Sequence, residues 1–91
     1  MLFMVIERFK NRDAVAVYRR YREHGRMMPE GLKYVDSWVE PNYDRCFQLM
    51  ECDDTSLFKQ WMTHWEDLVE FELVPVVTSK EAAEAVTSTN S

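Results

Sequence analysis

Three side chains in this sequence have the chemistry for proton transfer. Asp36 and Glu51 lie in two stretches of alternating polar and apolar residues, and His64 lies in the amphipathic stretch that follows. A carboxyl group set among apolar side chains has a raised pKa, because burial disfavours its charged form, and it can then act as a general acid or base. Histidine titrates near neutral pH without such a shift. Asp36, Glu51 and His64 are therefore the candidate catalytic residues.

Aromatic side chains accompany the carboxylates, and this mixture is typical of a small-molecule site. Ligand pockets are usually lined by apolar and aromatic groups with a few convergent polar ones. Glu70 and Glu72 join the set if Phe71 and Leu73 turn toward the helices. The candidate ligand-binding residues are Tyr34, Asp36, Trp38, Phe47, Glu51 and Glu72.

Packing is the competing and simpler interpretation of the same residues. The carboxylates would then pair across a subunit interface with basic side chains, and Trp38 and Phe47 would form an aromatic cross-strand pair. The basic candidates are Arg8, Lys33 and Arg45.

The residue types argue against metal, cofactor and phosphate chemistry. His24 is the only other histidine, so His64 has no histidine-rich metal site to join and is a poor haem ligand. Its simplest interpretation is a partly exposed side chain with a local hydrogen bond. The only glycines, Gly25 and Gly31, form no phosphate loop, and no serine-nucleophile motif is present. We therefore expect no cofactor and no metal.

Length, charge and cysteines bound the class of protein. A chain of 91 residues predicts one domain, and its net charge of −5 argues against a nucleic-acid partner, which needs a basic surface. No stretch approaches the roughly 20 apolar residues of a membrane span. Cys46 and Cys52 fall in one predicted strand, about 20 Å apart, which is beyond disulfide reach. Reduced thiols predict a cytoplasmic protein without a membrane partner.

Alternation and helical periodicity predict the elements that position these residues. The predicted strands cover residues 2–9, 32–40, 45–52 and 69–77. A first helix begins after Asn11 or Asp13 and ends at Gly25. A second follows the caps at 53–56, and its apolar stripe consists of Leu57, Phe58, Trp61, Met62 and Trp65. Residues 80–86 predict a short third helix, and 87–91 a frayed polar end.

The turn at 41–44 predicts the register of the central hairpin. A four-residue turn places Glu40 opposite Arg45, an opposite-charge cross-strand pair. The further facing pairs on that side of the sheet are Trp38 with Phe47, Asp36 with Leu49, and Tyr34 with Glu51.

This order of elements is the βαββαβ pattern of a ferredoxin-like α+β sandwich. Helices with single apolar stripes cover only one sheet face, so the other face, with its aromatic residues, would be left exposed. Exposing such a patch favours association. We therefore expect a homodimer that forms through the open sheet face as a dimeric α+β barrel. Residues 1–79 would be the barrel domain, and 80–91 a short C-terminal helix and flexible tail.

Several strings in the sequence carry a resemblance. They are Pro29-Glu30-Gly31, the strand ending in Trp38, the strand from Phe47 to Glu51 before Asp53-Asp54, and Trp61 and Trp65-Glu66-Asp67-Leu68 followed by Phe71-Glu72-Leu73-Val74-Pro75-Val76. Over residues 1–83 the chain resembles a family of small bacterial proteins of unknown function within the dimeric α+β-barrel superfamily. The resemblance implies a two-subunit barrel with a cavity between the sheets, and no established catalytic residues.

Two functions follow as expectations, with a third left open. The first is a homodimeric module that binds a small molecule in the cavity between the two sheets. The second is a cofactor-independent enzyme, a monooxygenase or isomerase, in which a buried carboxylate or His64 acts as the base. A purely structural interaction domain is the third.

Overall fold

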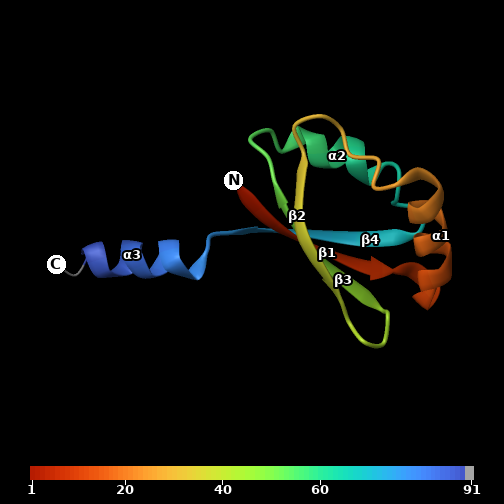
Figure 1. Cartoon of the computed structure of the whole chain (residues 1–91), viewed down its shortest axis with the longest axis horizontal. Helices are drawn as coiled ribbons and strands as arrows, with labels where there is room; N and C mark the ends of the chain where they lie inside the picture. The colour runs from red at the N-terminus through yellow and green to blue at the C-terminus, as the bar shows by residue number, and fades with distance from the viewer. Residues whose placement is uncertain (90–91) are drawn as a thin grey trace.

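Four strands and three α-helices make up the part of the chain that the computed structural model describes, residues 1–89 (Figure 1). The strands are β1 (Leu2–Phe9), β2 (Lys33–Val39), β3 (Arg45–Glu51) and β4 (Val69–Val76). The helices are α1 (Ala14–His24), α2 (Ser56–Met62) and α3 (Ser79–Thr89), with a 3₁₀ helix, η1, at Lys10–Arg12. Every strand lies within one residue of its predicted bounds at each end, so the alternation was a sound guide.

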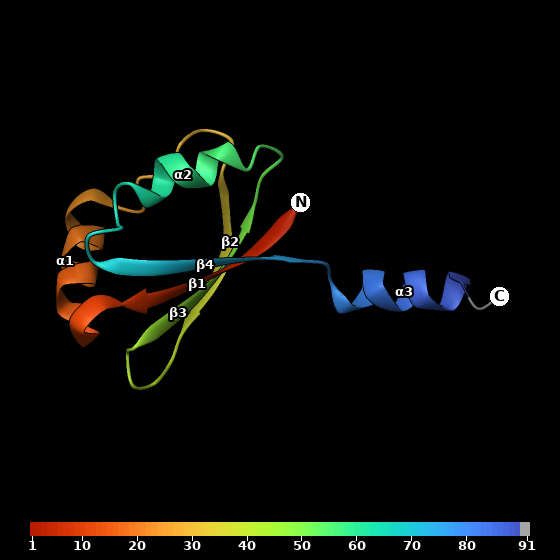
Figure 2. The same cartoon turned by 180° about the vertical axis from the view of Figure 1, so that it is seen from behind.

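The four strands form one antiparallel sheet in the order β2-β3-β1-β4. β1 is central and pairs with both β3 and β4. Each helix that joins two strands therefore crosses over the one strand between them. Helices α1 and α2 lie on the same side of the sheet (Figures 1 and 2), which leaves the other side as an open face.

The core lies between the sheet and these two helices. Along β1 the buried side chains Phe3, Val5 and Phe9 alternate with half-buried ones on the open face. The Phe3 ring meets the ring of Phe58 on α2 edge-on, with 5.0 Å between their centroids. Val17 of α1 closes the same core. The period-2 pattern of the strand thus fixes which face the helices cover.

Helix α1 begins and ends where its sequence predicts. The Asp13 carboxylate accepts a hydrogen bond from the Ala16 backbone N–H at 3.1 Å, which satisfies one of the free donors of the first turn. The chain leaves the helix at Gly25, whose φ of 68° is one that glycine adopts without strain. The capping predictions are confirmed for this helix.

Helix α2 is shorter than its apolar stripe predicts. It ends at Met62, and Trp65 lies in the turn that follows, although it is still buried. The Thr63 hydroxyl donates to the Gln60 carbonyl at 2.7 Å, and such a local bond competes with continuation of the helix. The prediction that Trp65 packs in the core is confirmed, but the expected helical position is wrong.

An irregularity in β2 overturns part of the predicted hairpin register. Trp38 pairs with Phe47 and Asp36 with Leu49 as expected, but Tyr34 pairs with Met50 and not with Glu51, because the register shifts between Tyr34 and Asp36. One extra residue in a strand breaks the alternation, so the side chains beyond it lie on the face opposite to the one that strict alternation predicts. Tyr34 therefore lies on the helix side of the sheet.

Helix α3 stands apart from the rest of the described chain, beyond the end of β4 (Figures 1 and 2). It runs to Thr89, three residues beyond the predicted end of the helix at residue 86, and the expected flexibility of the tail stays a prediction. A hydrogen bond from the Thr87 hydroxyl to the Ala83 carbonyl, at 2.8 Å, belongs to this last turn. Residues 90–91 of the predicted tail lie outside the described residues.

Candidate functional site

The open face of the sheet carries most of the residues that the sequence singles out. The register places Trp38, Phe47 and Glu72 in one row across the sheet, joined by Ile6 of β1. Asp36 lies in the next row and Glu51 in the one after it. Five of the six predicted ligand-binding residues therefore share a face, as expected.

The carboxylates of this face are not in apolar surroundings. Asp36, Glu51 and Glu72 are all exposed, and the Asp36 carboxylate accepts a hydrogen bond from the backbone N–H of Ser37 at 2.8 Å. The face holds a polar hollow of about 190 Å³, in which Glu70 and Glu72 lie with two of the predicted basic residues, Arg8 and Arg45. The three predicted carboxylates of this face are thus solvent-exposed in the single chain that the structure describes.

His64 lines neither the polar hollow of the open face nor the hollow under the helices described below. Its side chain is exposed, in the turn after α2. Its backbone carbonyl accepts a hydrogen bond from the Arg20 guanidinium at 2.9 Å, and the same guanidinium forms two bonds with Asp67, at 2.7 and 2.8 Å. The residue thus takes part in a local structural contact between α1 and the turn before β4.

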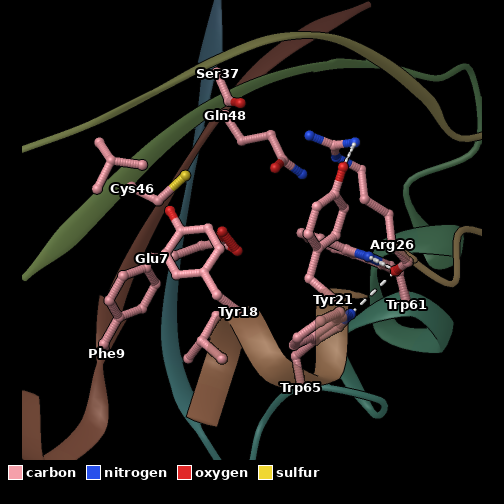
Figure 3. A pocket seen from close by; sticks show the side chains of 12 residues that line it. Glu7, Phe9, Tyr18, Tyr21, Arg26, Ser37, Cys46, Gln48, Trp61 and Trp65 are labelled. Atoms are coloured by element: carbon pink, nitrogen blue, oxygen red, sulfur yellow. Dashed lines mark hydrogen bonds between the residues drawn. The ribbon is translucent and has the colours of Figure 1, made fainter. Parts of the chain in front are cut away.

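A second hollow of about 80 Å³ lies on the opposite side of the sheet, between the strands and α1 (Figure 3). Aromatic and aliphatic side chains make up most of its wall, with a carboxyl, a thiol, an amide and a guanidinium among them. It is lined by Glu7, Phe9, Val17, Tyr18, Tyr21, Arg26, Ser37, Val39, Cys46, Gln48, Trp61 and Trp65. We refer to it as the helix-side pocket.

Glu7 is the buried acid of this pocket. It shares the inward parity of Phe3, Val5 and Phe9 on β1, so the strand itself places its carboxyl under the helices, only 9% exposed. Burial raises its pKa to about 7, while a hydrogen bond with Cys46 and the charge of Arg26 oppose the increase. A carboxyl with this pKa holds or releases a proton near neutral pH, which a general acid or base requires.

Cys46 and Tyr18 are neutral neighbours of Glu7. Cys46 is its cross-strand partner on β3, and burial and the nearby Glu7 raise the pKa of the thiol to about 12. Burial, followed by electrostatic interaction with Cys46 and Glu7, also raises the pKa of the Tyr18 hydroxyl. Neither group is a nucleophilic anion at neutral pH, so the chemistry of the pocket centres on the carboxyl.

Arg26 supplies the positive charge of the pocket from the loop after α1. Its guanidinium lies over the Tyr34 ring, 3.7 Å from the centroid, and 5.0 Å from that of Tyr21, whose hydroxyl accepts a hydrogen bond from it at 3.3 Å. Its backbone carbonyl accepts hydrogen bonds from the indole N–H groups of Trp61 and Trp65, at 2.9 and 3.1 Å. Figure 3 shows both contacts. The two tryptophans hold the loop so that Arg26 faces the pocket.

Sequence reasoning missed Glu7 and Arg26, although a signal existed for the first. Glu7 interrupts an otherwise apolar parity of β1, and a charged residue at an inward position of a central strand is the exception that merits attention. Arg26 carries no such signal, because it lies in a loop whose course depends on the contacts of the two tryptophans. Of the predicted site residues only Tyr34 reaches this side, where it stacks on Arg26.

Within residues 1–89, no group of three or more His, Cys, Asp or Glu side chains is placed to hold a metal ion. The same part of the chain contains no helix that is long and apolar enough to cross a membrane.

Fold and pocket together define the class of protein: an α+β domain with an open four-stranded antiparallel sheet and one acid-containing pocket beneath its helices. The chain belongs to the family described as a domain of unknown function, DUF3303, whose model matches residues 1–90. A comparison with curated proteins finds no match.

Proposed function

We propose that this domain binds a small, partly apolar molecule in the helix-side pocket and that Glu7 exchanges a proton with it. The single observation that carries the proposal is a carboxyl group, 9% exposed and with a pKa near 7, in the wall of an otherwise mostly apolar hollow. A structural carboxylate is normally paired or solvated, because burying it is costly. Such a cost is commonly borne at functional sites.

The size of the pocket restricts the ligand. An apolar cavity of about 150 Å³ accommodates benzene, and this hollow holds about 80 Å³. The rings of Tyr18 and Tyr21 line it and are 40% and 41% exposed, so it communicates with solvent beside α1. We infer that a group of a few carbon atoms enters, while any larger part of the ligand rests between these tyrosines.

The pocket replaces the inter-sheet cavity as the place of binding. On the open face the candidate carboxylates are exposed, whereas the helix-side pocket has both aromatic walls and a desolvated acid. Trp38, Phe47 and their neighbours are then better explained by subunit packing.

We further propose that a second copy of the chain covers the open face, as in a ferredoxin-like dimeric α+β barrel. The strand order β2-β3-β1-β4 supports the ferredoxin-like assignment. On this face the middle rows of the sheet are almost entirely apolar, while charges lie at the ends of the rows and in the outer rows. The apolar residues of the whole face are Leu2, Met4, Ile6, Trp38, Phe47, Leu49, Val74 and Val76. An apolar centre with a charged rim is the anatomy of a protein–protein interface.

Binding in the pocket is tested by tryptophan fluorescence. Trp61 and Trp65 line the pocket and Trp38 lies on the other face, so a Trp38→Phe variant reports the pocket alone. We expect small apolar fragments to change the emission of this variant, and Glu7→Gln to alter their affinity. Glu70→Gln, the same change on an exposed residue, is the control. A fragment collection that leaves the emission unchanged would refute the proposal.

Proton-transfer catalysis is a second candidate function, favoured by the pKa of Glu7. A base of this strength can remove a proton from a carbon next to a carbonyl, the first step of an isomerase or a cofactor-independent monooxygenase. The test follows exchange of such protons of a bound fragment with deuterated solvent by NMR. Exchange that is accelerated by the wild type and by Glu70→Gln, but not by Glu7→Gln, would support catalysis, and equal rates for all three would exclude it.

A further inference from the structure

Among residues 1–89, no carboxylate lies within ion-pair distance of the Arg26 guanidinium, although its charge acts on Glu7 in the same pocket. Ion pairs within 4.0 Å join Arg12 to Asp44, Arg20 to Asp67 and Arg45 to Glu40, but none of those in residues 1–89 includes Arg26. Its guanidinium is half-buried and lines the helix-side pocket. While Glu7 holds its proton, this half-buried cation has no anion beside it in the described chain, and it can bind an external one.

Arg26 is also fixed in position, which a binding group requires. Tyr34 and Tyr21 hold its guanidinium by cation–π contacts, and the indoles of Trp61 and Trp65 hold its backbone carbonyl. The long Arg26 side chain is thus already ordered in the free protein. Because little further conformational entropy is lost when a ligand binds, the affinity is higher. One N–H of the guanidinium donates to the Tyr21 hydroxyl, and the others have no carboxylate within ion-pair distance among residues 1–89.

The other charges at the pocket allow only one negative group. Glu7 faces Cys46 on β3, Tyr18 on α1 and Arg26 in the loop, and its neighbour on β4, Phe71, carries no charge. When Glu7 holds its proton, the pocket contains one cation and no anion. A dianionic ligand would carry one negative charge more than Arg26 can neutralise, and a cationic ligand would be repelled by Arg26.

We propose that the ligand is a small monocarboxylic acid, whose carboxylate binds the Arg26 guanidinium while its apolar part enters the pocket beside protonated Glu7. This inference rests on the proposed function, since it names the ligand class of the same pocket. A guanidinium matches a carboxylate with two parallel N–H···O bonds. The hollow of about 80 Å³ fits an alkyl chain of a few carbons or part of one ring.

The affinity for such an acid falls as pH rises above 7. The ligand is ionised throughout, whereas Glu7 loses its proton near pH 7 and then repels the bound carboxylate. Above pH 7, binding of the acid is therefore coupled to uptake of one proton by Glu7. The affinity then decreases by as much as about tenfold for each pH unit above 7. The amide of the same acid has no charge and shows a much weaker dependence.

The experiment compares propionate, butyrate and benzoate with their amides in the Trp38→Phe variant, by fluorescence and by NMR, from pH 5.5 to 8.5. We expect each acid to bind at least tenfold more tightly than its amide at pH 6, and to lose this preference at pH 8.5. Arg26→Gln should abolish the preference, whereas Arg22→Gln, an exposed arginine of α1, should retain it. Glu7→Gln should remove the pH dependence.

Amides that bind as tightly as acids at pH 6 would overturn the inference and leave the proposed binding function standing. Absence of binding by acids and amides alike would overturn both. Equal acid preference in Arg26→Gln and the wild type would also refute the role of Arg26. Should Arg26→Gln fail to fold, the pH profile of the acid–amide preference in the Trp38→Phe protein decides without it.

Discussion

At the scale of single residues, Glu7 makes the free energy of unfolding depend on pH. Its carboxyl has a pKa of about 7 in the folded chain against 4.5 for the ordinary value. Below pH 4.5 it is neutral in both the folded and unfolded chains. Between pH 4.5 and 7 the unfolded chain releases the proton and the folded chain retains it, so stability falls as pH rises through this window. Above pH 7 the loss is complete, at about 3 kcal/mol.

A Glu7→Gln variant should therefore be more stable than the wild type at pH 8, by about 1–3 kcal/mol, and no more stable at pH 4. The amide keeps the shape of the side chain and cannot ionise. Urea unfolding at the two pH values measures the difference. Glu70→Gln, on an exposed residue of β4, serves as the matched control and should show no such crossover. A wild type that gains stability between pH 5 and 7 relative to Glu7→Gln would contradict a buried carboxyl with a raised pKa.

The thiols should be inert in the native protein. Cys46 is 7% exposed with a pKa raised to about 12, and burial also raises the pKa of Cys52, which is 3% exposed. Alkylation needs the thiolate, so iodoacetamide at pH 7.5 should leave both unmodified for hours and react at once in urea. Mass spectrometry counts the adducts. Rapid labelling of Cys46 without denaturant would show that the pocket wall is open.

The sequence was informative about residue positions and poor about their environment. It placed Asp36, Trp38, Phe47 and Glu51 on one sheet face, because strand alternation is a local property. It left the face of Glu72 open, and the pairing of Glu72 with Ile6 settles that point. It did not indicate which carboxyl is desolvated, since this depends on where the helices lie. The acid in the pocket is Glu7, and β1 alone gave a sign of it.

At the scale of elements, two tryptophans fix the loop that carries Arg26. Both indole N–H groups donate to the same carbonyl, so either one alone still satisfies it. We expect the destabilising effects of Trp61→Phe and Trp65→Phe to be more than additive: the double variant should lose about 1 kcal/mol more stability than the sum of the two single losses. A double-mutant cycle of urea unfolding measures this coupling. Strict additivity would mean that water replaces the lost donors.

Element bounds and the hairpin register from Glu40 to Asp36 followed from local sequence signals, whereas the pairing of Tyr34 did not. Caps, turn and alternation set the strands and α1. The shift in β2 between Tyr34 and Asp36 has no sequence signal of its own, because no glycine or proline marks it. Its consequence is large, since it moves Tyr34 to the helix side, where the ring supports Arg26.

At the scale of the whole molecule, the open face is the surface on which we propose that a second copy binds. Its centre is apolar, and Leu49 lies there between Asp36 of β2 and Met4 of β1. If a second copy covers it, Leu49→Glu places a charge in the middle of the contact. We expect a wild type that sediments as a dimer at micromolar concentration and a Leu49→Glu variant that sediments as a monomer. Sedimentation velocity measures both.

The control for this change is Glu51→Gln, which alters charge at the rim of the same strand and should leave the dimer intact. A wild type that remains a folded monomer at 100-fold higher concentration would remove the proposed interface. The helix-side pocket does not depend on that outcome, because all its lining residues come from one chain.

Helix α3 has a thermal consequence. It comprises 11 residues and stands away from the layers that hold the core, and helices shorter than about 12–15 residues are marginal in water when nothing packs on them. Warming a lone subunit should therefore produce a gradual early loss of ellipticity at 222 nm, followed by a sharper transition in the near-ultraviolet bands of the tryptophans. The two spectroscopic curves would separate in any subunit whose final helix remains uncovered.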